Sequence, residues 1–133
     1  MSFMKWEAEY SVGHAEIDAQ HRDMIEILNE FFEALKDGQA SEQQKQLLER
    51  FVACTEKHFD TEERELCRVD YHDLISHRRL HDGLRTAIAD FAQTFATNKK
   101  RCPQAIQILK KRLVDHFQEA DRAYARYFTK VKA

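Results

Sequence analysis

Apolar residues recur along this chain at the spacing of one helix face. From Ile17 to Lys36, and again in three later stretches, they return every three or four residues, which is the periodicity of an amphipathic α-helix. Three breaks separate the stretches: KDGQ at 36–39, RVDYHD at 68–73 and ATNKKRCP at 96–103. The pattern therefore predicts four long helices joined by short connections.

Residues at the breaks predict where the helices begin and end. Gly38 is suited to a left-handed C-cap that closes the first helix. Ser41 and Gln44 have the spacing of a capping box, which predicts the start of the second helix. Pro103 fits the first turn of the fourth helix, where its missing N–H costs nothing.

Short connections between helices of about 20 residues place neighbouring helices antiparallel. We therefore expect an all-α fold, an up-down-up-down antiparallel four-helix bundle with an N-terminal arm. The 133 residues suit one core and one domain. In this interpretation residues 1–133 form a single domain, with residues 1–16 as the arm and residues 17–133 as the bundle.

Composition narrows the class of protein. The net charge is -2 and basic residues are interspersed with acidic ones, so no basic patch indicates a nucleic-acid partner. No apolar run approaches the length of a membrane span, and the N-terminus has no apolar signal segment. Three cysteines without close spacing argue against structural disulfides. We expect a cytoplasmic monomer.

Polar residues interrupt the faces that the helices should bury. A lone histidine on such a face is ordinarily a core residue with satisfied hydrogen bonds. Here five histidines and two carboxylates lie on four stripes: His21, His58, Glu62, His77, His81, His116 and Asp121. Burying an unpaired carboxylate costs on the order of several kcal/mol, so the pattern predicts a positive charge inside the bundle.

Bound metal ions can supply that charge. Residues four apart differ by ~40° around a helix and ~6 Å along it, so His77 with His81, and His58 with Glu62, can reach one centre. His116 and Asp121 are five apart, or ~140° in a regular helix. Either a π-type widening brings these two together, or they approach two different ions.

The number of candidate ligands favours two ions. Seven ligands exceed the four of a structural zinc site, and carboxylates can bridge a pair of metals. Imidazole and carboxylate together suit iron, although donor softness alone leaves zinc and manganese open.

These residues resemble the hemerythrin family, specifically its single-domain bacterial members. The resemblance begins with Trp6, Tyr10 and VG at 12–13 and continues through IDAQH, which ends in His21. HFDTEE at 58–63 and Tyr71 follow, and the pattern closes with the H-x4-D-x2-Y of residues 116–124. Myohemerythrin, a relative in that family, is a known example of this bundle topology.

The resemblance implies a role for each ligand position. His77, His81 and His116 would hold one iron that is coordinatively full. His21 and His58 would hold the second iron, which keeps an open position. Glu62 and Asp121 would bridge the two Fe ions, and an oxo or hydroxo group would form the third bridge.

The implied function is reversible dioxygen binding, for transport, storage, supply or sensing. Five neutral imidazoles beside two carboxylates differ from the carboxylate-rich sites of di-iron oxidases, so we expect a binding protein and not an enzyme. Azide and nitric oxide are further candidate ligands. The alternatives are a di-iron enzyme acting on peroxide or nitric oxide, and a protein for iron storage or detoxification.

Residues next to the ligands should shape the pocket for dioxygen. We expect four core residues to line it: Met24, Phe59, Leu113 and Phe117. The sequence departs from the usual family pattern at four positions. Tryptophan is common at the position of Arg112, and the other three departures are Phe117, Cys67 and His72. We expect Cys67 to be a small core residue, and His14 and His72 to be non-ligands because they lie outside the helical stripes.

Overall fold

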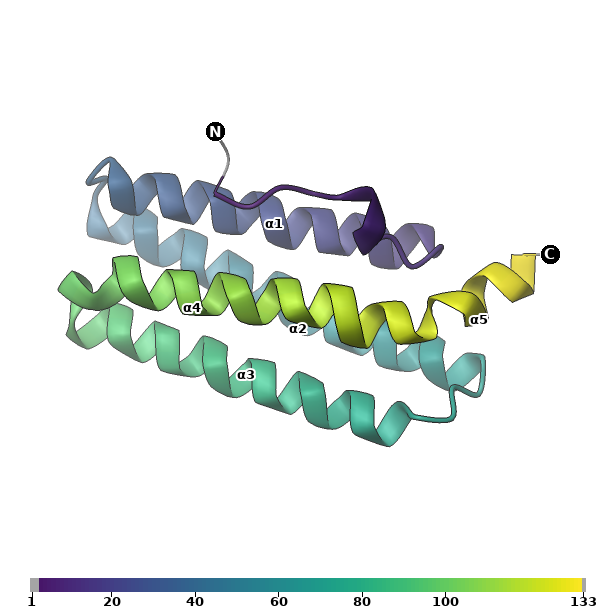
Figure 1. Cartoon of the computed structure of the whole chain (residues 1–133). Helices are drawn as coiled ribbons and strands as arrows, with labels where there is room; N and C mark the ends of the chain where they lie inside the picture. Colours follow the sequence, from purple (N-terminus) through teal and green to yellow (C-terminus); the bar gives the residue numbers. More distant parts are fainter. Residues whose placement is uncertain (1–2, 133) are drawn as a thin grey trace.

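Figure 1 shows the computed structural model, in which four antiparallel helical runs pack into a bundle. The structure describes the backbone of residues 3–132, and the side chains of that range apart from residues 120 and 129–132. The runs have these bounds: α1 Ala15–Lys36, α2 Ser41–Arg68, α3 Leu74–Thr97, and a fourth run of α4 Cys102–Asp115, η3 His116–Asp121 and α5 Arg122–Lys132. No strand occurs among the described residues, which confirms the predicted all-α class. The antiparallel arrangement of the four runs confirms the predicted up-down-up-down bundle (Figure 1). The predicted domain, 1–133, also includes residues 1–2 and 133, which lie outside the described part.

An N-terminal arm runs along α1, as predicted, and contains the short 3-10 turn η1 Ala8–Tyr10 (Figure 1). Met4 fastens this arm, because its backbone N–H and carbonyl both bond the Asn29 side chain at 2.8 Å. The helix α1 begins two residues earlier than predicted. His14 caps it, since His14 Nδ1 accepts a hydrogen bond from the Ile17 N–H at 3.3 Å.

Two of the predicted boundary residues act as expected. Gly38 follows α1 with a φ of 67°, in the left-handed region that glycine tolerates, and Pro103 lies in the first turn of α4. The predicted capping box is wrong, because α2 begins at Ser41 itself and no side chain caps it. Ser41 Oγ instead accepts a bond from Lys99 Nζ at 2.6 Å. Gln44 Nε2 donates to the carbonyl of Ala34 near the end of α1 and to that of Gln39 in the connection.

A layer of buried polar side chains divides the apolar core into two clusters. On α1 this layer lies between Ile17 of the smaller cluster and Met24 of the larger one. On α2 it lies between Leu66 of the smaller cluster and Phe59 of the larger one. The fold therefore encloses a polar layer between two apolar clusters.

Cys67 corrects one expectation, because the structure exposes it to solvent. Its neighbour Leu66 is fully buried, and successive helix residues point ~100° apart, so the end of α2 buries Leu66 and turns Cys67 outward. Separately, no helix among the described residues is long and apolar enough to cross a membrane.

Candidate metal centre

The polar layer is a cluster of side chains from all four helical runs. Its seven members are His21 of α1, His58 and Glu62 of α2, His77 and His81 of α3, and His116 and Asp121 of η3. All are buried, and His116, the most accessible of them, exposes 7% of its surface. The structure thus brings together every residue that the helical stripes singled out as a candidate ligand.

The fourth run reaches the cluster through a π-helix. Residues His116–Asp121 form this π-helical segment, η3, between α4 and α5. A π-turn contains an extra residue, because its hydrogen bonds join residues five apart. His116 and Asp121 therefore lie on one side of the helix, and of the two arrangements that the sequence left open, the local widening is the one observed.

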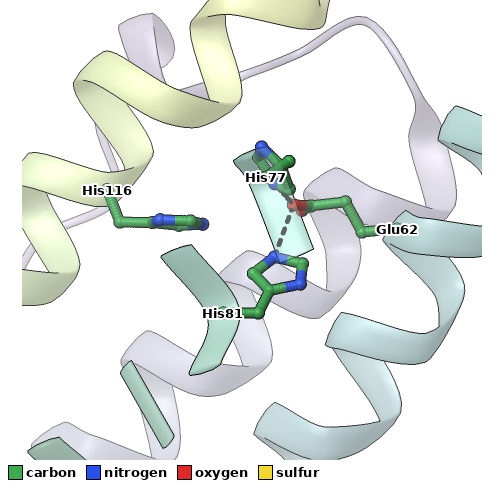
Figure 2. Close-up of side chains that lie close together, drawn as sticks. All are labelled: Glu62, His77, His81 and His116. Atoms are coloured by element: carbon green, nitrogen blue, oxygen red, sulfur yellow. Dashed lines mark hydrogen bonds and ion pairs between the residues drawn. The ribbon is translucent and has the colours of Figure 1, made fainter. Parts of the chain in front are cut away.

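Three histidines and one carboxylate form the first group of candidate ligands, the three-histidine group. One donor atom each from Glu62, His77, His81 and His116 lies within 4.8 Å of the others. Figure 2 shows Glu62 reaching from α2 toward the two histidines of α3, with His116 facing them. His81 Nε2 lies 3.0 Å from Glu62 Oε1, and His77 Nε2 contacts the same oxygen.

Two histidines and two carboxylates form the second group, the two-histidine group. Its members are His21, His58, Glu62 and Asp121, again with donor atoms within 4.8 Å of one another. His58 Nε2 lies 2.8 Å from Glu62 Oε2. His21 Nε2 lies 3.0 Å from Asp121 Oδ2. This group has one imidazole fewer than its neighbour.

The carboxylates of Glu62 and Asp121 lie between the two groups. Glu62 presents Oε1 to the three-histidine group and Oε2 to the two-histidine group. Asp121 Oδ1 lies 2.9 Å from His116 Nε2, whereas its Oδ2 faces His21. Each carboxylate can therefore bridge two cations.

Several of these atoms touch without forming hydrogen bonds. His58 Nε2 and Glu62 Oε2 are 2.8 Å apart, yet both are buried and neither has a hydrogen-bond partner among the described residues. The same holds for His116 Nε2 and both oxygens of Asp121. Leaving a buried polar group unsatisfied costs about 1–3 kcal/mol. Cations between the side chains satisfy these atoms together, so the residues present fit a pair of metal ions.

The charges of the cluster are mutually dependent. Burial raises the pKa of Glu62 and Asp121, but the imidazoles around them hold both pKa values below the ordinary range. Burial lowers the pKa of His21, yet the carboxylates of Asp121 and Glu62 outweigh it and raise that pKa to about 9. The same carboxylates raise the pKa of His77 to about 10. The pKa of His58 is lowered, chiefly by burial. Protons and cations therefore compete for His21 and His77.

The family model described as "Hemerythrin HHE cation binding domain" matches residues 12–128. The chain belongs to the hemerythrin family. A bacteriohemerythrin of Methylococcus capsulatus is 28% identical over 126 residues, which cover 93% of this chain and 95% of that protein. A myohemerythrin of Theromyzon tessulatum is 27% identical over 121 residues, or 90% and 89% of the two chains. A crystal structure of wild-type hemerythrin shares the fold, with a TM-score of 0.83, 22% identity, and coverage of 96% and 99%.

Glu63 orients the candidate ligand His81, although Glu63 itself belongs to neither ligand group. Its Oε2 lies 2.7 Å from His81 Nδ1, the ring nitrogen that faces away from the cluster. Arg78 Nε donates to the other oxygen of Glu63 at 3.2 Å. A carboxylate in this position fixes the tautomer of an imidazole ligand and makes it a stronger donor.

Gln20 orients the candidate ligand His58 in the same way, through a neutral amide in place of a carboxylate. Gln20 Oε1 lies 3.1 Å from His58 Nδ1, and Gln20 Nε2 donates to Thr61 Oγ1 at 3.0 Å. The sequence interpretation missed both Gln20 and Glu63. Each adjoins a candidate ligand in sequence, but a neighbouring residue points ~100° away around the helix, and the sequence alone does not say what it meets there.

The four predicted pocket residues are all buried, and two of them contact candidate ligands. The Phe117 ring lies 4.4 Å from the His21 ring, centroid to centroid, and so adjoins the two-histidine group. The Phe59 ring stacks on His81 at 4.1 Å and so adjoins the three-histidine group. Met24 and Leu113 lie in the larger apolar cluster. That these residues line a dioxygen pocket stays a prediction.

A surface pocket of about 370 Å³ borders the three-histidine group. Its lining is Leu80, Leu84, Arg112, Asp115, His116 and Glu119. Arg112, one of the departures from the family pattern, donates to the Gly83 carbonyl at 3.3 Å. A larger pocket, of about 620 Å³, lies between α2 and α3 at the other end of the bundle, and no cluster residue lines it.

The two remaining histidines lie outside both groups. His14 Nε2 is 2.9 Å from Glu65 Oε1 at the start of α1. The exposed ring of His72 accepts a hydrogen bond from the Tyr127 hydroxyl at 2.6 Å.

Proposed function

We propose that this chain binds dioxygen reversibly at an oxo- or hydroxo-bridged di-iron centre. His77, His81 and His116 hold one iron, and His21 and His58 hold the other. Glu62 and Asp121 bridge them. In this proposal the chain is a carrier, store or supplier of dioxygen, which it binds and releases without consuming it.

The observation that carries the proposal is the asymmetry of the two ligand groups. Each group contains four residues, but Asp121 also places Oδ1 2.9 Å from His116 Nε2. With both carboxylates shared, one ion has three imidazoles and the other has two. The second ion therefore keeps an open coordination position, where a small ligand can bind. A pair of ferrous ions supplies the two electrons that dioxygen takes up on binding.

The donor set supports iron and a balanced charge. Imidazole together with carboxylate is a donor set that suits iron. Two ferrous ions, two carboxylates and one hydroxide leave a small positive charge, and the pKa values of Glu62 and Asp121 keep these groups ionised. The two ions then satisfy atoms of five ligands that otherwise lack partners: His21, His58, Glu62, His116 and Asp121.

The surroundings of the open position support binding in place of turnover. Phe117 packs against His21 with only 1% of its surface exposed, and Met24 adds a second apolar wall from α1. The apolar Phe117 ring donates no proton itself, which favours release of bound dioxygen over its reduction. Azide and nitric oxide are small enough to compete for the same position.

The compartment belongs to the same proposal. All three cysteines are free thiols, and free thiols persist in a reducing compartment. We place the protein in the cytoplasm.

Optical spectra of the iron-loaded protein under argon, then air, then argon again test the proposal. We expect a visible absorption band that appears in air and disappears under argon. His58→Ala should abolish this band and leave one iron bound, and His77→Ala should lose metal. His72→Ala is the matched control, because His72 lies outside both groups. Irreversible bleaching, or turnover of peroxide or nitric oxide with no such band, would favour an enzyme.

A further inference from the structure

A row of aromatic rings leads from the metal centre to the surface near the C-terminal end of the bundle. The Tyr71 ring lies 6.4 Å from the ring of the candidate ligand His77 and 5.0 Å from the ring of Tyr127, centroid to centroid. Tyr127 in turn donates its hydroxyl to His72 Nδ1 at 2.6 Å. A second branch runs through Tyr124, whose ring is 5.4 Å from His77 and 6.0 Å from Tyr71.

The side chains of this row become more exposed with distance from the metal centre. Tyr124 is fully buried, Tyr71 exposes 8% of its surface, Tyr127 is half-buried and His72 is exposed. The row therefore connects the closed centre with solvent through side chains in contact. It ends on a phenol that is hydrogen-bonded to a base.

We propose that this row is a redox relay, which carries oxidising equivalents from the metal centre to the surface pair Tyr127 and His72. Its oxidant is hydrogen peroxide, and its terminal electron donor is a one-electron reductant of the phenol or ascorbate class. This activity goes beyond reversible dioxygen binding, but it rests on the proposed di-iron centre.

Atoms and electrons balance in this step. One hydrogen peroxide takes up two electrons from the relay and two protons from solvent, its O–O bond breaks, and it leaves as two waters. Each electron comes from Tyr127 by way of Tyr71, so the relay works twice for each peroxide. The Tyr127 phenol loses its proton to His72 Nδ1 as it loses the electron. The reductant then returns one electron, and the proton goes back from His72 to the phenol oxygen. The reductant releases one proton to solvent for each electron that it gives, so two reductant molecules are oxidised for each peroxide.

The acceptor for the proton decides which tyrosine is oxidised. A phenol releases an electron far more readily when a base takes its proton at the same moment, and neutral imidazole is such a base. Tyr127 has His72 as this base at 2.6 Å. Among the described residues, the buried Tyr124 hydroxyl has only the Glu62 carboxylate near it, and in this proposal Glu62 is occupied by the two cations. The electron therefore leaves from Tyr127.

A second aromatic row on the other side of the centre is a natural comparison. It runs from His21 to Phe117 at 4.4 Å and from Phe117 to Tyr10 at 5.7 Å, and then to Trp6 at 5.8 Å. A phenylalanine ring is much harder to oxidise than a phenol, so an electron cannot stop at Phe117 and transfer along that row needs one longer step. Tyr10 thus provides a matched control for Tyr127.

The experiment treats the iron-loaded full-length protein with hydrogen peroxide. Electron paramagnetic resonance of freeze-quenched samples detects a tyrosyl radical. Reducing gels, dityrosine fluorescence and peptide mass spectrometry show which tyrosine cross-links, and the reducing conditions remove any disulfide through the exposed Cys67. Tyr127→Phe keeps the ring and removes the phenol. His72→Gln keeps a hydrogen-bond acceptor and removes the base.

We expect wild-type protein to give a radical and cross-links that map to Tyr127. Tyr127→Phe should lose both signals, His72→Gln should strongly reduce them, and Tyr10→Phe should keep them. Zinc-loaded protein should give neither signal. Signals that persist in Tyr127→Phe, map to Tyr10 or appear with zinc would overturn the relay.

Iron content and the air–argon spectrum of every variant separate this proposal from the proposed function. Both should match wild type in Tyr127→Phe, because Tyr127 lies outside the ligand groups. Wild-type protein that binds dioxygen reversibly but yields no radical would overturn the relay alone. A chain that takes up no iron would overturn both proposals together.

Discussion

His116 and Asp121 stand five residues apart and still meet, because the π-helical segment η3 turns them to the same side. Asp121 Oδ1 lies 2.9 Å from His116 Nε2, whereas in a regular α-helix two residues at this spacing would be ~140° apart. The other oxygen of Asp121 faces His21 of α1. One helical run can therefore supply both a terminal ligand and a carboxylate shared between two ions.

Replacing Asp121 with asparagine should disable the centre without unfolding the bundle. Asp121→Asn keeps the size of the side chain but removes its charge and one bridging oxygen. We expect iron to fall from two ions per chain to one or fewer, with the air-induced band lost. Elemental analysis beside circular dichroism measures this. Asp115→Asn is the control, because the Asp115 carboxylate pairs at the surface with Lys111. Two irons retained in Asp121→Asn would contradict the bridging role.

That the seven candidate ligands would share the interior could be predicted from the sequence, because helical periodicity fixes which residues share a face. His77 and His81 stand four apart on an apolar stripe, and the structure buries both. The i,i+5 pair could only be stated as two alternatives, since sequence spacing does not reveal where a helix widens. The Ser41 capping box failed because the local pattern says nothing of Lys99, which lies across the bundle and bonds the Ser41 hydroxyl.

The surroundings of the ligands could not be predicted in the same way. Glu63 and Gln20 reach histidines on other helices, and those contacts depend on how the helices are rotated against one another. The exposure of Cys67 shows the same limit, because one position along a helix separates a core residue from a solvent-facing one.

Glu63 should tune the three-histidine group through His81. Glu63→Gln keeps a hydrogen-bond acceptor near His81 Nδ1 but removes the negative charge. Loss of such an outer partner typically costs 10–100-fold in metal affinity, and we expect a loss on the order of 10-fold. Competition with a chelator measures it. Glu56→Gln on the same helix is the control, since Glu56 pairs only with Arg85 among the contacts described. Equal affinities in the two variants would show that Glu63 has no such role.

Cation uptake should strengthen as pH rises. The carboxylates raise the pKa of His21 to about 9 and that of His77 to about 10, so both rings carry protons at pH 7 before a cation binds. Each must lose its proton to become a ligand. Apparent affinity should therefore increase from pH 7 until about pH 9–10 and then level off, and binding should release protons. Calorimetry in buffers of different ionisation enthalpy measures the release. Uptake at pH 7 without proton release would show that these rings are already neutral.

Phe117 should protect the open position. Phe117→Ala opens a cavity beside His21 and should destabilise the fold by about 3–5 kcal/mol. With water able to enter, the oxygenated form should decay faster in air and azide should bind faster to the oxidised protein, while both irons stay bound. Decay of the visible band and stopped-flow azide binding measure these changes. Phe91→Ala controls for the stability loss, because Phe91 lies in the same apolar core but belongs to neither ligand group. Unchanged decay would mean that Met24 or Leu113 closes the pocket.

Dioxygen uptake measured against iron content tests the central claim most directly. Iron-loaded, reduced protein is titrated with dissolved dioxygen while an oxygen electrode and the visible spectrum are followed, and the sample is then purged with argon. We predict that one dioxygen binds for every two irons and that nearly all of it returns to the gas phase on purging. Consumption of dioxygen beyond that ratio, or uptake that argon cannot reverse, would contradict reversible binding at a shared di-iron centre.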